Sequence, residues 1–410
     1  MTSVTVEQNN LIRALAGALS CLVLAATPAF ALRPIGIDVS NNQGTNFPWS
    51  TAKNTDGISF AWAKATEGFT FNDAAFTANE AHAPAAGVLI GAYHYARPDN
   101  QLGLAGADQE ASHFWSIASP YIKNADGNTY LMPMLDIEQD LTGAGYTKTT
   151  LSQWVNRWCT DIQNYGTAAG LKITPVVYTY IDYANTWLDS TVAQSWPLWM
   201  ASYNNASPQT GAPNSIGPWA NWQFWQYNAA APRGGDSDVI NGDANTLKDY
   251  IVGSVGRFND GARIQATANL KAWNTAASNG TFVTEPLGAL GTILQGPVYG
   301  ASYQRWQIRY ADGTIGWSAE DFLSQVADAV PGDFNIDGKV DMADYVSWRN
   351  GQSPTPNSAT DYDTWRTHFG QSNLGAGSGS SLTNTAVPEP ASLLYLALAP
   401  LLSLYRRRRR

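Results

Sequence analysis

The sequence predicts an α/β protein: an irregular (β/α) barrel, followed by a small all-β barrel and a helical calcium-loop module. Between residues 33 and 254, short and largely continuous apolar segments alternate with helix-like stretches, as in parallel sheets that are covered on both faces. Shorter strand-like segments with turn signals follow at 257–326. An acidic loop with the ligand spacing of a calcium site comes next, at 333–344.

The first domain, residues 32–254, is expected to contain eight strands. Apolar and aromatic residues dominate each strand, and turn-forming residues separate them. The strands are expected at 35–40, 58–64, 88–95, 131–138, 173–180, 197–202, 222–227 and 236–240. Segments 72–87 and 151–170 fit crossover helices. The segments between the last three strands are too short, or too rich in Pro and Gly, to form full helices. The expected barrel is therefore irregular.

Composition and charge limit the possible partners. The 410 residues include 24 Lys+Arg and 33 Asp+Glu, a formal net charge of −9, which argues against nucleic acid as a partner. Aromatic residues make up 12% of the chain and charged residues only 14%, which suits large cores and the binding of a neutral, hydroxylated ligand. If Cys21 is removed with a leader peptide, Cys159 remains as a single thiol, and no internal disulfide can form.

The N-terminus is expected to be a secretory signal peptide, residues 1–31. Arg13 precedes an apolar run that ends in the small-residue pattern at Ala29 and Ala31. The alternative is a retained membrane anchor, but Pro28 interrupts the run, and ~20 apolar residues are needed to span a bilayer.

The C-terminus has three parts in order. A Gly/Ser-rich linker at 371–386 precedes the motif VPEP at 387–390, and an apolar run then ends in five arginines, 406–410. This order resembles the PEP-CTERM sorting signal, here at 387–410. The resemblance implies that an exosortase-type protease removes the tail and that the protein is exported to the cell envelope, the cell surface or the exterior. A plain C-terminal anchor is the alternative.

Acidic residues stand at or just after the ends of several expected strands. In a barrel, the carboxyl ends of the strands converge on one mouth, where active sites are built. Carboxylates crowded there repel one another and shift each other's pKa values, which is typical of catalytic sites. These acids are Asp38, Glu67, Asp136, Glu138 and Asp238.

The pair Asp136 and Glu138 is the sharpest local feature. Side chains two residues apart on a strand point to the same face, ~6.5–7 Å apart along the chain, whereas Ile137 points the other way. One carboxyl group can donate a proton to a leaving oxygen while the other stabilises positive charge, as cleavage of a glycosidic bond requires. A strand that simply ends in two solvated acids is the alternative, and the acids at the other strand ends disfavour it.

Motifs throughout residues 33–253 resemble, in order, those of glycoside hydrolase family 25, the lysozymes also called N,O-diacetylmuramidases. They are GIDVSNNQG (36–44), KATEG (64–68), GAYHYARP (91–98), LDIE (135–138), YTY (178–180), LWMASY (198–203), WQFWQY (222–227) and DVINGD (238–243). The resemblance implies hydrolysis of the β-1,4 bond between N-acetylmuramic acid and N-acetylglucosamine in peptidoglycan, without a cofactor for catalysis.

The resemblance also implies roles for single residues. Glu138 is expected to be the general acid/base and Asp136 its partner, with Asp38 and Asp238 as further active-site acids. Asp236 is an alternative to Asp238, which is preferred because VINGD follows it. The expected lining of the sugar groove is Glu67, Tyr93, Tyr178, Trp199, Tyr203 and Trp225, with Trp199 and Trp225 favoured for stacking on sugar faces.

Two mechanisms fit these assignments. Either Asp136 attacks the anomeric carbon, or the N-acetyl group of the substrate attacks it while Asp136 orients and stabilises that group. The family and the spacing of the pair favour the second route, with retention of configuration. The alternatives to an active muramidase are an inactive wall-binding protein and a hydrolase of another N-acetylated glycan such as chitin.

The order of the strands and turns in residues 257–326 resembles a bacterial Src-homology-3-like domain. The segment 269–273 replaces the usual first motif, and Gly316-Trp317 stands at the usual GW. Such modules often bind wall peptides, and a structural spacer is the alternative.

Residues 328–370 have the loop spacing of a calcium site. Oxygen ligands are expected at loop positions 1, 3, 5, 7, 9 and 12, with Gly338 at position 6 for the sharp turn. The ligands are Asp333, Asn335, Asp337, Lys339 through its carbonyl, Asp341 and Asp344. Asp in place of Glu at the last position shortens the reach of that ligand and lowers the expected affinity.

The patterns DYVSWR (344–349) and DYDTWR (361–366) repeat after this loop. Loop and repeat together resemble a dockerin-type module, which implies one structural Ca²⁺ and a cohesin-bearing partner protein. A spacer stabilised by calcium is the alternative.

Overall fold

The computed structural model describes residues 32–123, 130–254, 256–326, 330–335, 337–353 and 355–372. The expected signal peptide at 1–31, nearly all of the linker and the sorting tail at 387–410 lie outside these residues, so they remain predictions. Among the described helices, none has the length and apolar character needed to cross a membrane.

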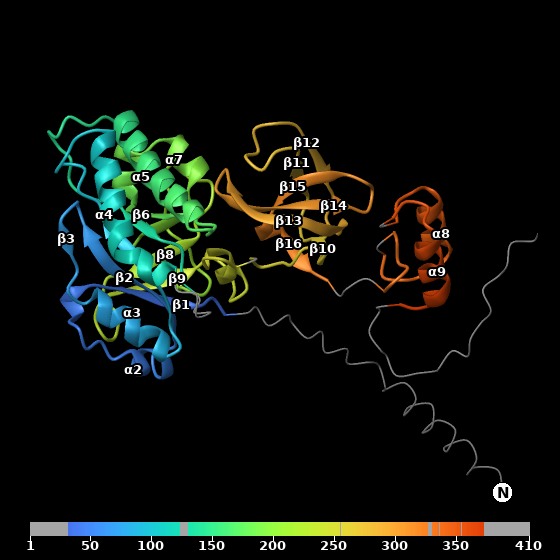
Figure 1. Ribbon diagram of the computed structural model, residues 1–410, viewed down its shortest axis with the longest axis horizontal. Coiled ribbons are helices and arrows are strands. Elements are labelled where there is room, and N and C mark those ends of the chain that lie inside the picture. The colour runs from blue at the N-terminus through green and yellow to red at the C-terminus, as the bar shows by residue number, and fades with distance from the viewer. Residues whose placement is uncertain are drawn as a thin grey trace, which may run out of the picture. The chain divides into compact units, whose positions relative to one another are not determined.

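The first domain is a closed barrel (Figure 1). Its nine-stranded sheet closes because β1 pairs with both β2 and β9, which leaves β3 as a short edge strand on β2. The strands are β1 (Ile35–Val39), β2 (Ile58–Glu67), β3 (Phe71–Asn72), β4 (Leu89–Tyr95), β5 (Met134–Asp136), β6 (Val176–Tyr180), β7 (Leu198–Ala201), β8 (Phe224–Asn228) and β9 (Asp236–Ile240). The expected barrel is confirmed, and β3 is a strand additional to the eight expected.

The direction of the last strand differs from the prediction. Parallel pairing joins β1, β2 and β4 through β8 in succession, as their apolar runs indicated. β9 instead runs antiparallel to both β8 and β1. Only residues 229–235 connect β8 to β9, and a parallel crossover needs a dozen or more residues, so this link can only reverse the chain.

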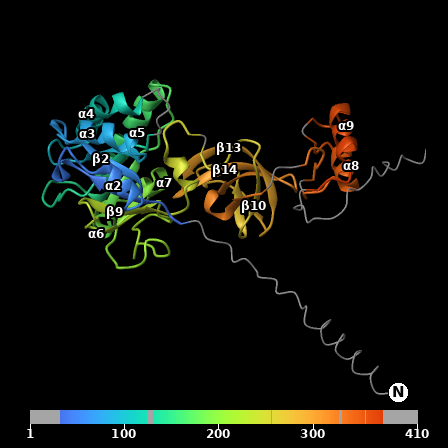
Figure 2. The same cartoon turned by 90° about the horizontal axis from the view of Figure 1, so that it is seen from below.

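Helices cover the outside of the barrel between the earlier strands (Figures 1 and 2). They are α2 (Trp49–Asn54), α3 (Phe76–Ala85), α4 (Leu104–Ile122), α5 (Lys148–Ala168), α6 (Ile181–Trp187) and α7 (Ser190–Ser195). The longest, α5, begins at a capping box in which the Thr147 hydroxyl oxygen accepts the Thr150 N–H. Between β7 and β8 the described segment 202–223 contains no helix, so the barrel is irregular, as expected.

Aromatic side chains fill the interior of the barrel. The Trp62 ring centroid lies 4.6 Å from that of Trp199 and 4.8 Å from that of Phe224, and Phe60 packs against both Trp62 and Phe224. All four side chains are fully buried. Because they close the interior, polar side chains of the same strands gather at one end of the barrel, where the parallel strands finish; we call this end the mouth.

Two smaller parts follow the barrel, each with its own core. The first is an antiparallel seven-stranded sheet in the order β12-β11-β15-β14-β13-β10-β16, with Trp306 and Ile308 fully buried. Its strands are β10 (Arg263–Ala266), β11 (Leu270–Trp273), β12 (Phe282–Glu285), β13 (Leu290–Gly300), β14 (Tyr303–Tyr310), β15 (Ile315–Ala319) and β16 (Leu323–Gln325). Its likeness to a Src-homology-3-like domain remains a prediction.

The second smaller part contains α8 (Met342–Arg349) and α9 (Ala359–His368). Val330, Val340 and Trp365 form its core. In each repeat the tryptophan donates its indole N–H to a backbone carbonyl. Trp348 donates to the Ser358 carbonyl, and Trp365 donates to the Asp341 carbonyl.

The interior cluster depends on a glycine in β1. A Cβ atom at Gly36 would overlap the ring of Phe60, which pairs with it on β2. We therefore expect Gly36→Ala to lower the free energy of unfolding by about 1–3 kcal/mol through overpacking, measured by thermal or urea denaturation. Adding Phe60→Leu should recover part of this loss. If the double variant loses as much stability as Gly36→Ala alone, or as much as the two single variants together, the packing described here is contradicted.

Candidate active site

A cavity of about 390 Å³ lies at the barrel mouth. It brings together side chains from strands that are far apart in the sequence. Of the residues predicted for the site, Asp38, Glu67, Tyr93, Asp136, Glu138, Tyr178 and Trp199 line it. The lining is mainly polar and acidic, as expected of a site that handles a hydroxylated ligand.

As the sequence predicted, the side chains of Asp136 and Glu138 point to one face of the sheet, and Ile137 points to the other. Asp136 closes β5 opposite Tyr95 of β4 and Tyr178 of β6, and both carboxyl groups line the cavity. Ile137 is fully buried on the other face. The buried Asp136 Oδ1 has no hydrogen-bond partner among the described residues.

The pKa values of Asp136 and Glu138 are both raised, so each carboxyl group holds a proton more tightly than the same side chain does in water. Burial, and then the negative charges of Glu138 and Asp38, raise the pKa of Asp136 well above its ordinary value. Burial, and then Asp236, raise the pKa of Glu138. A raised pKa favours the protonated form, which a general acid needs in order to give a proton to a leaving group.

The reversed direction of β9 explains the places of Asp236 and Asp238. In the β1–β9 pairing, Asp38 lies opposite Asp236, and Gly36 lies opposite Asp238. Asp236 therefore reaches the mouth and lines the cavity, whereas Asp238 lies one step deeper and is fully buried. The Trp199 indole N–H donates to Asp238 Oδ1 at 2.9 Å. Both of the alternative acids belong to the site, at different depths.

The acids of β1 and β9 titrate at unusually high pH. Burial, and then Asp236, raise the pKa of Asp38 to about 7, although a hydrogen bond from Gln226 opposes this shift. Burial and the charge of Asp38 raise the pKa of Asp238 well above its ordinary value. At neutral pH Asp38 is therefore partly ionised, and the pKa of Asp238 is shifted in the same direction.

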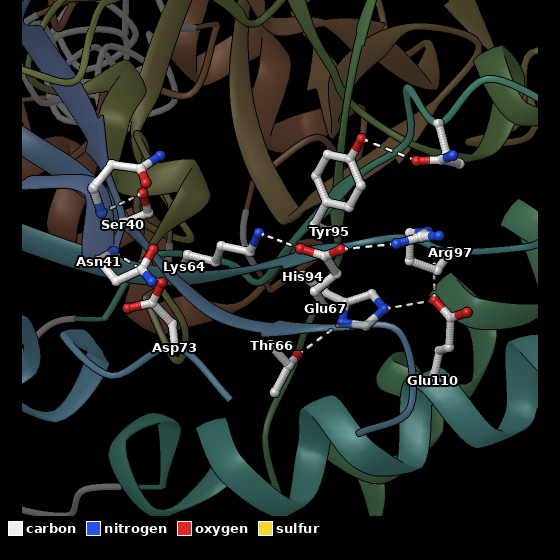
Figure 3. A network of polar contacts seen from close by, with 12 residues as sticks. Ser40, Asn41, Lys64, Thr66, Glu67, Asp73, His94, Tyr95, Arg97 and Glu110 are labelled. Carbon is white, nitrogen blue, oxygen red and sulfur yellow. Dashed lines mark hydrogen bonds and ion pairs between the residues drawn. The ribbon is translucent and has the colours of Figure 1, made fainter. Parts of the chain in front are cut away.

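Cations neutralise the acid at the end of β2 (Figure 3). Lys64 Nζ lies 2.7 Å from Glu67 Oε2, and Arg97 contacts Glu67 Oε1 at 3.1 Å. Burial alone would raise the pKa of Glu67, but Lys64 and Arg97 outweigh it and hold this pKa below its ordinary value. Glu67 is therefore an ionised, paired carboxylate. Sequence reasoning did not single out Lys64, although a lysine within an apolar strand was a usable signal.

His94 belongs to the support of the site and not to the cavity lining (Figure 3). Its ring is fully buried, with Nδ1 2.8 Å from Thr66 Oγ1 and Nε2 2.8 Å from Glu110 Oε2. Glu110 Oε2 also accepts the Arg97 N–H. Burial lowers the pKa of His94. Through its two hydrogen bonds, the ring connects β2, β4 and α4.

The structure corrects the stacking roles expected of two tryptophans. Trp225 is fully buried and does not line the cavity, because neighbouring residues of β8 point to opposite faces and its indole N–H bonds the Ser202 carbonyl outside the barrel. Trp199 lines the cavity floor but is also fully buried, so its ring face is not open to a sugar. Tyr203, at 55% exposure, is accessible, and its hydroxyl bonds Gln226.

Gln226 is a site residue that sequence reasoning missed. It lines the cavity from β8, next to the misassigned Trp225. The strand alternation that turns Trp225 outward turns Gln226 inward, so the direction of β8 side chains was the signal that could have identified it.

The expected calcium loop is only partly described, because residue 336 lies outside the described residues. Asp333 accepts the N–H groups of Asp337 and Gly338, and Gly338 has a φ of 87°, as a sharp turn requires. The last expected ligand, Asp344, accepts the N–H groups of Asn335 and Asp341. Within the described ranges, no His, Cys, Asp and Glu side chains are grouped as metal ligands would be, so the calcium site remains a prediction.

Comparison with known proteins decides the family. The model of glycosyl hydrolases family 25 matches residues 37–236. Lysozyme M1 of Streptomyces globisporus is 35% identical over 226 residues, which cover 52% of this chain and 69% of that relative. The chain belongs to glycosyl hydrolase family 25. This family 25 protein is therefore a glycoside hydrolase, and the match spans the cavity and the Asp136–Glu138 pair.

Further similar proteins cover the same part of this family 25 chain. The N,O-diacetylmuramidase of Chalaropsis sp is 28% identical, over 53% of this chain and 99% of that protein. Among solved structures, the lysozyme from Streptomyces coelicolor is 31% identical over 52% of this chain and 95% of its own, with a TM-score of 0.45. The muramidase from Acremonium alcalophilum is 32% identical over 52% and 97%, with a TM-score of 0.43.

The raised pKa of Asp38 predicts how stability depends on pH. Because its pKa is about 7 in the folded state against 3.8 for the free side chain, the folded state prefers the proton. The stability that this preference contributes is complete below pH 3.8 and is lost as pH rises through about 7. Asp38→Asn stays neutral, so at pH 8 it should be more stable than the parent by on the order of 2 kcal/mol, with little difference at pH 4.

Melting temperatures at both pH values check this prediction. Asp182→Asn is the control, because Asp182 is an exposed acid of α6 and should give nearly the parent's pH dependence. A variant at Asp38 that is no more stable than the parent at pH 8 would contradict the crowding of charges at the mouth.

Proposed function

We propose that the protein is a muramidase, which hydrolyses the β-1,4 bond between N-acetylmuramic acid and N-acetylglucosamine in peptidoglycan. The observation that carries this proposal is the Asp136–Glu138 pair at the end of β5, facing a cavity lined by further acids, in a family 25 chain. The names of similar proteins, a lysozyme and an N,O-diacetylmuramidase, support the choice of substrate.

In the proposed first step, the acetamido oxygen of the substrate attacks the anomeric carbon as the bond to the leaving oxygen breaks. Glu138 transfers its proton to that oxygen, and its raised pKa favours the protonated form that this step needs. Asp136, in its ionised form, accepts the acetamido N–H and stabilises the positive charge that develops on the ring formed.

In the second step, Glu138, now ionised, takes a proton from water as that water attacks the anomeric carbon and reopens the ring. Two displacements at the same carbon retain its configuration. Direct attack by Asp136 in the first step is the alternative route and also retains configuration. An inverted first-formed product, seen by NMR, would contradict both routes.

We expect Glu138→Gln to lower the rate of peptidoglycan hydrolysis by about 10²–10⁴-fold, because the amide cannot transfer the proton. The variant should still sediment with purified peptidoglycan, since the cavity keeps its shape. The measurement is loss of turbidity of a peptidoglycan suspension. The matched control is Asp140→Asn, which removes a fully exposed carboxylate two residues away and should leave the rate unchanged.

The same assay run with chitin separates the alternatives. Clearing of peptidoglycan by the parent, but not by Glu138→Gln, supports the proposal. Clearing of chitin alone would replace the substrate. Sedimentation with peptidoglycan without any hydrolysis would make the protein an inactive wall-binding protein, and full activity of Glu138→Gln would remove Glu138 from its role.

We also propose that the protein is exported and reaches the cell envelope, the cell surface or the exterior. The pattern of residues 1–31 and the tail at 387–410 support this proposal, with an exosortase-type protease as the partner that processes the tail. The strand-rich part at 257–326 is proposed to bind wall peptides, and the helical part at 328–370 to bind a cohesin-bearing protein.

Calcium binding by the helical part gives a separate prediction. Carboxylate and carbonyl oxygens at this spacing fit Ca²⁺, and the turn at Gly338 has the required left-handed conformation. Titration calorimetry of the intact protein should show one Ca²⁺ bound, and removal of calcium by a chelator should lower the melting temperature of the part that holds Trp348 and Trp365. Asp333→Asn should abolish the binding heat.

The control for this titration is Asp363→Asn, an exposed acid of α9 outside the loop, which should bind Ca²⁺ as the parent does. Binding that survives Asp333→Asn, or no binding by the parent, would contradict the calcium site.

A further inference from the structure

Gln226 makes four hydrogen bonds inside the cavity wall. Its Oε1 accepts the hydroxyl hydrogens of Tyr178 at 2.9 Å and of Tyr203 at 2.5 Å. Its Nε2 donates to Asp38 Oδ2 at 2.7 Å and to Asp236 Oδ2 at 3.2 Å. A primary amide has two N–H donors and two acceptor lone pairs, so every hydrogen-bonding position of this side chain is used.

The partners also fix which way the amide faces. Two carboxyl groups lie on its nitrogen side, and two phenol groups lie on its oxygen side. Rotating the amide by half a turn would place its oxygen against the acids Asp38 and Asp236, which offer acceptors when ionised. Gln226 is 2% exposed, so water does not replace these partners. The side chain is held rigidly between β6, β1 and β9.

We propose that Gln226 is a positioning residue of this active site: its hydrogen bonds favour the ionised form of Asp38 and take up the hydroxyl hydrogens of Tyr178 and Tyr203, so that neither phenol donates to the substrate. This inference rests on the proposed muramidase activity and names a residue outside the acids assigned to it.

The first consequence concerns Asp38. The groups that face it are themselves acidic: Asp236 and Asp238 from β9, Asp136 and Glu138 from the end of β5, and the hydroxyl groups of Tyr93, Tyr178 and Tyr203. The charges of Asp236 and Glu138 disfavour a charge on Asp38, whereas Asp238 favours it through a hydrogen bond. Gln226 donates to the same carboxyl group without carrying charge, so it favours the ionised form against this repulsion.

The second consequence concerns the tyrosines. Each phenol has a single hydrogen, and both hydrogens are given to Gln226. Tyr178 lines the cavity, and its hydroxyl hydrogen is already given to Gln226. Such a phenol oxygen can accept from a sugar hydroxyl or an acetamido N–H and cannot donate to a carbonyl. The hydroxyl group of Tyr178 is therefore suited to the donor groups of an N-acetylated sugar.

Two variants separate these consequences. Gln226→Glu keeps an oxygen for the tyrosines but replaces the amide donor with a carboxyl oxygen, so the hydrogen bonds to the acids Asp38 and Asp236 are lost and those from the tyrosines can remain. Gln226→Met removes both sets of hydrogen bonds and keeps the side-chain length. The matched control is Gln223→Met. Gln223 is also a buried glutamine, at 4% exposure, and accepts the Leu198 N–H at 2.7 Å. It does not line the cavity.

The experiment measures kcat and KM against pH with soluble peptidoglycan fragments, together with melting temperatures, for the intact protein. Both Gln226 variants should shift the acid-side fall of kcat to higher pH by about one unit, because Asp38 then ionises at higher pH. Gln226→Met should also raise KM several-fold more than Gln226→Glu, because only the former releases the tyrosine hydroxyl groups. Gln223→Met should lower the melting temperature and leave the pH profile in place.

The outcomes distinguish this inference from the proposed function. A parent that does not hydrolyse peptidoglycan overturns the proposed function, and this inference with it. An active parent whose Gln226→Glu variant folds and keeps the parent's pH profile overturns only the role of Gln226. The same holds if Gln223→Met shifts the profile equally, since the shift would then report a general loss of packing.

Discussion

The crowding of carboxyl groups at the barrel mouth governs this site. Asp38, Asp136, Glu138 and Asp236 line one cavity of about 390 Å³, and Asp238 lies directly beneath them. Burial raises the pKa of every one of these acids, and repulsion by neighbouring acids adds to the shift of Asp38, Asp136, Glu138 and Asp238. A glycosidase needs both a proton to give and a negative charge near the anomeric carbon, and crowding of this kind supplies both at neutral pH.

The interior of the barrel is what keeps this crowding in place. The aromatic cluster around Trp62 closes the space below the mouth, and Trp199 belongs both to that cluster and, through its indole N–H, to the support of Asp238. The reversed β9 contributes Asp236 and Asp238 to one face at two depths. At the end of β2, next to β1, Lys64 and Arg97 pair with Glu67, so this carboxylate neutralises positive charge at the mouth.

Sequence patterns predicted the barrel and the Asp136–Glu138 alternation, because apolar runs and the two-residue period of a strand are local properties. The direction of β9 was missed, although the short link at 229–235 contains the signal. The depth of Asp238, the outward direction of Trp225 and the four bonds of Gln226 depend on how separate strands align. Such alignment is tertiary, and no single segment of the sequence carries it.

The identity of the sugar exposed at the cut chain end tests the central claim most directly. Purified peptidoglycan is digested with the protein, the new reducing ends are converted to sugar alcohols with borohydride, and the alcohols are identified after acid hydrolysis. Cleavage by the Asp136–Glu138 pair as proposed yields the alcohol of muramic acid. The alcohol of glucosamine as the sole new end would contradict it, because the other glycosidic bond of the chain would then have been cut.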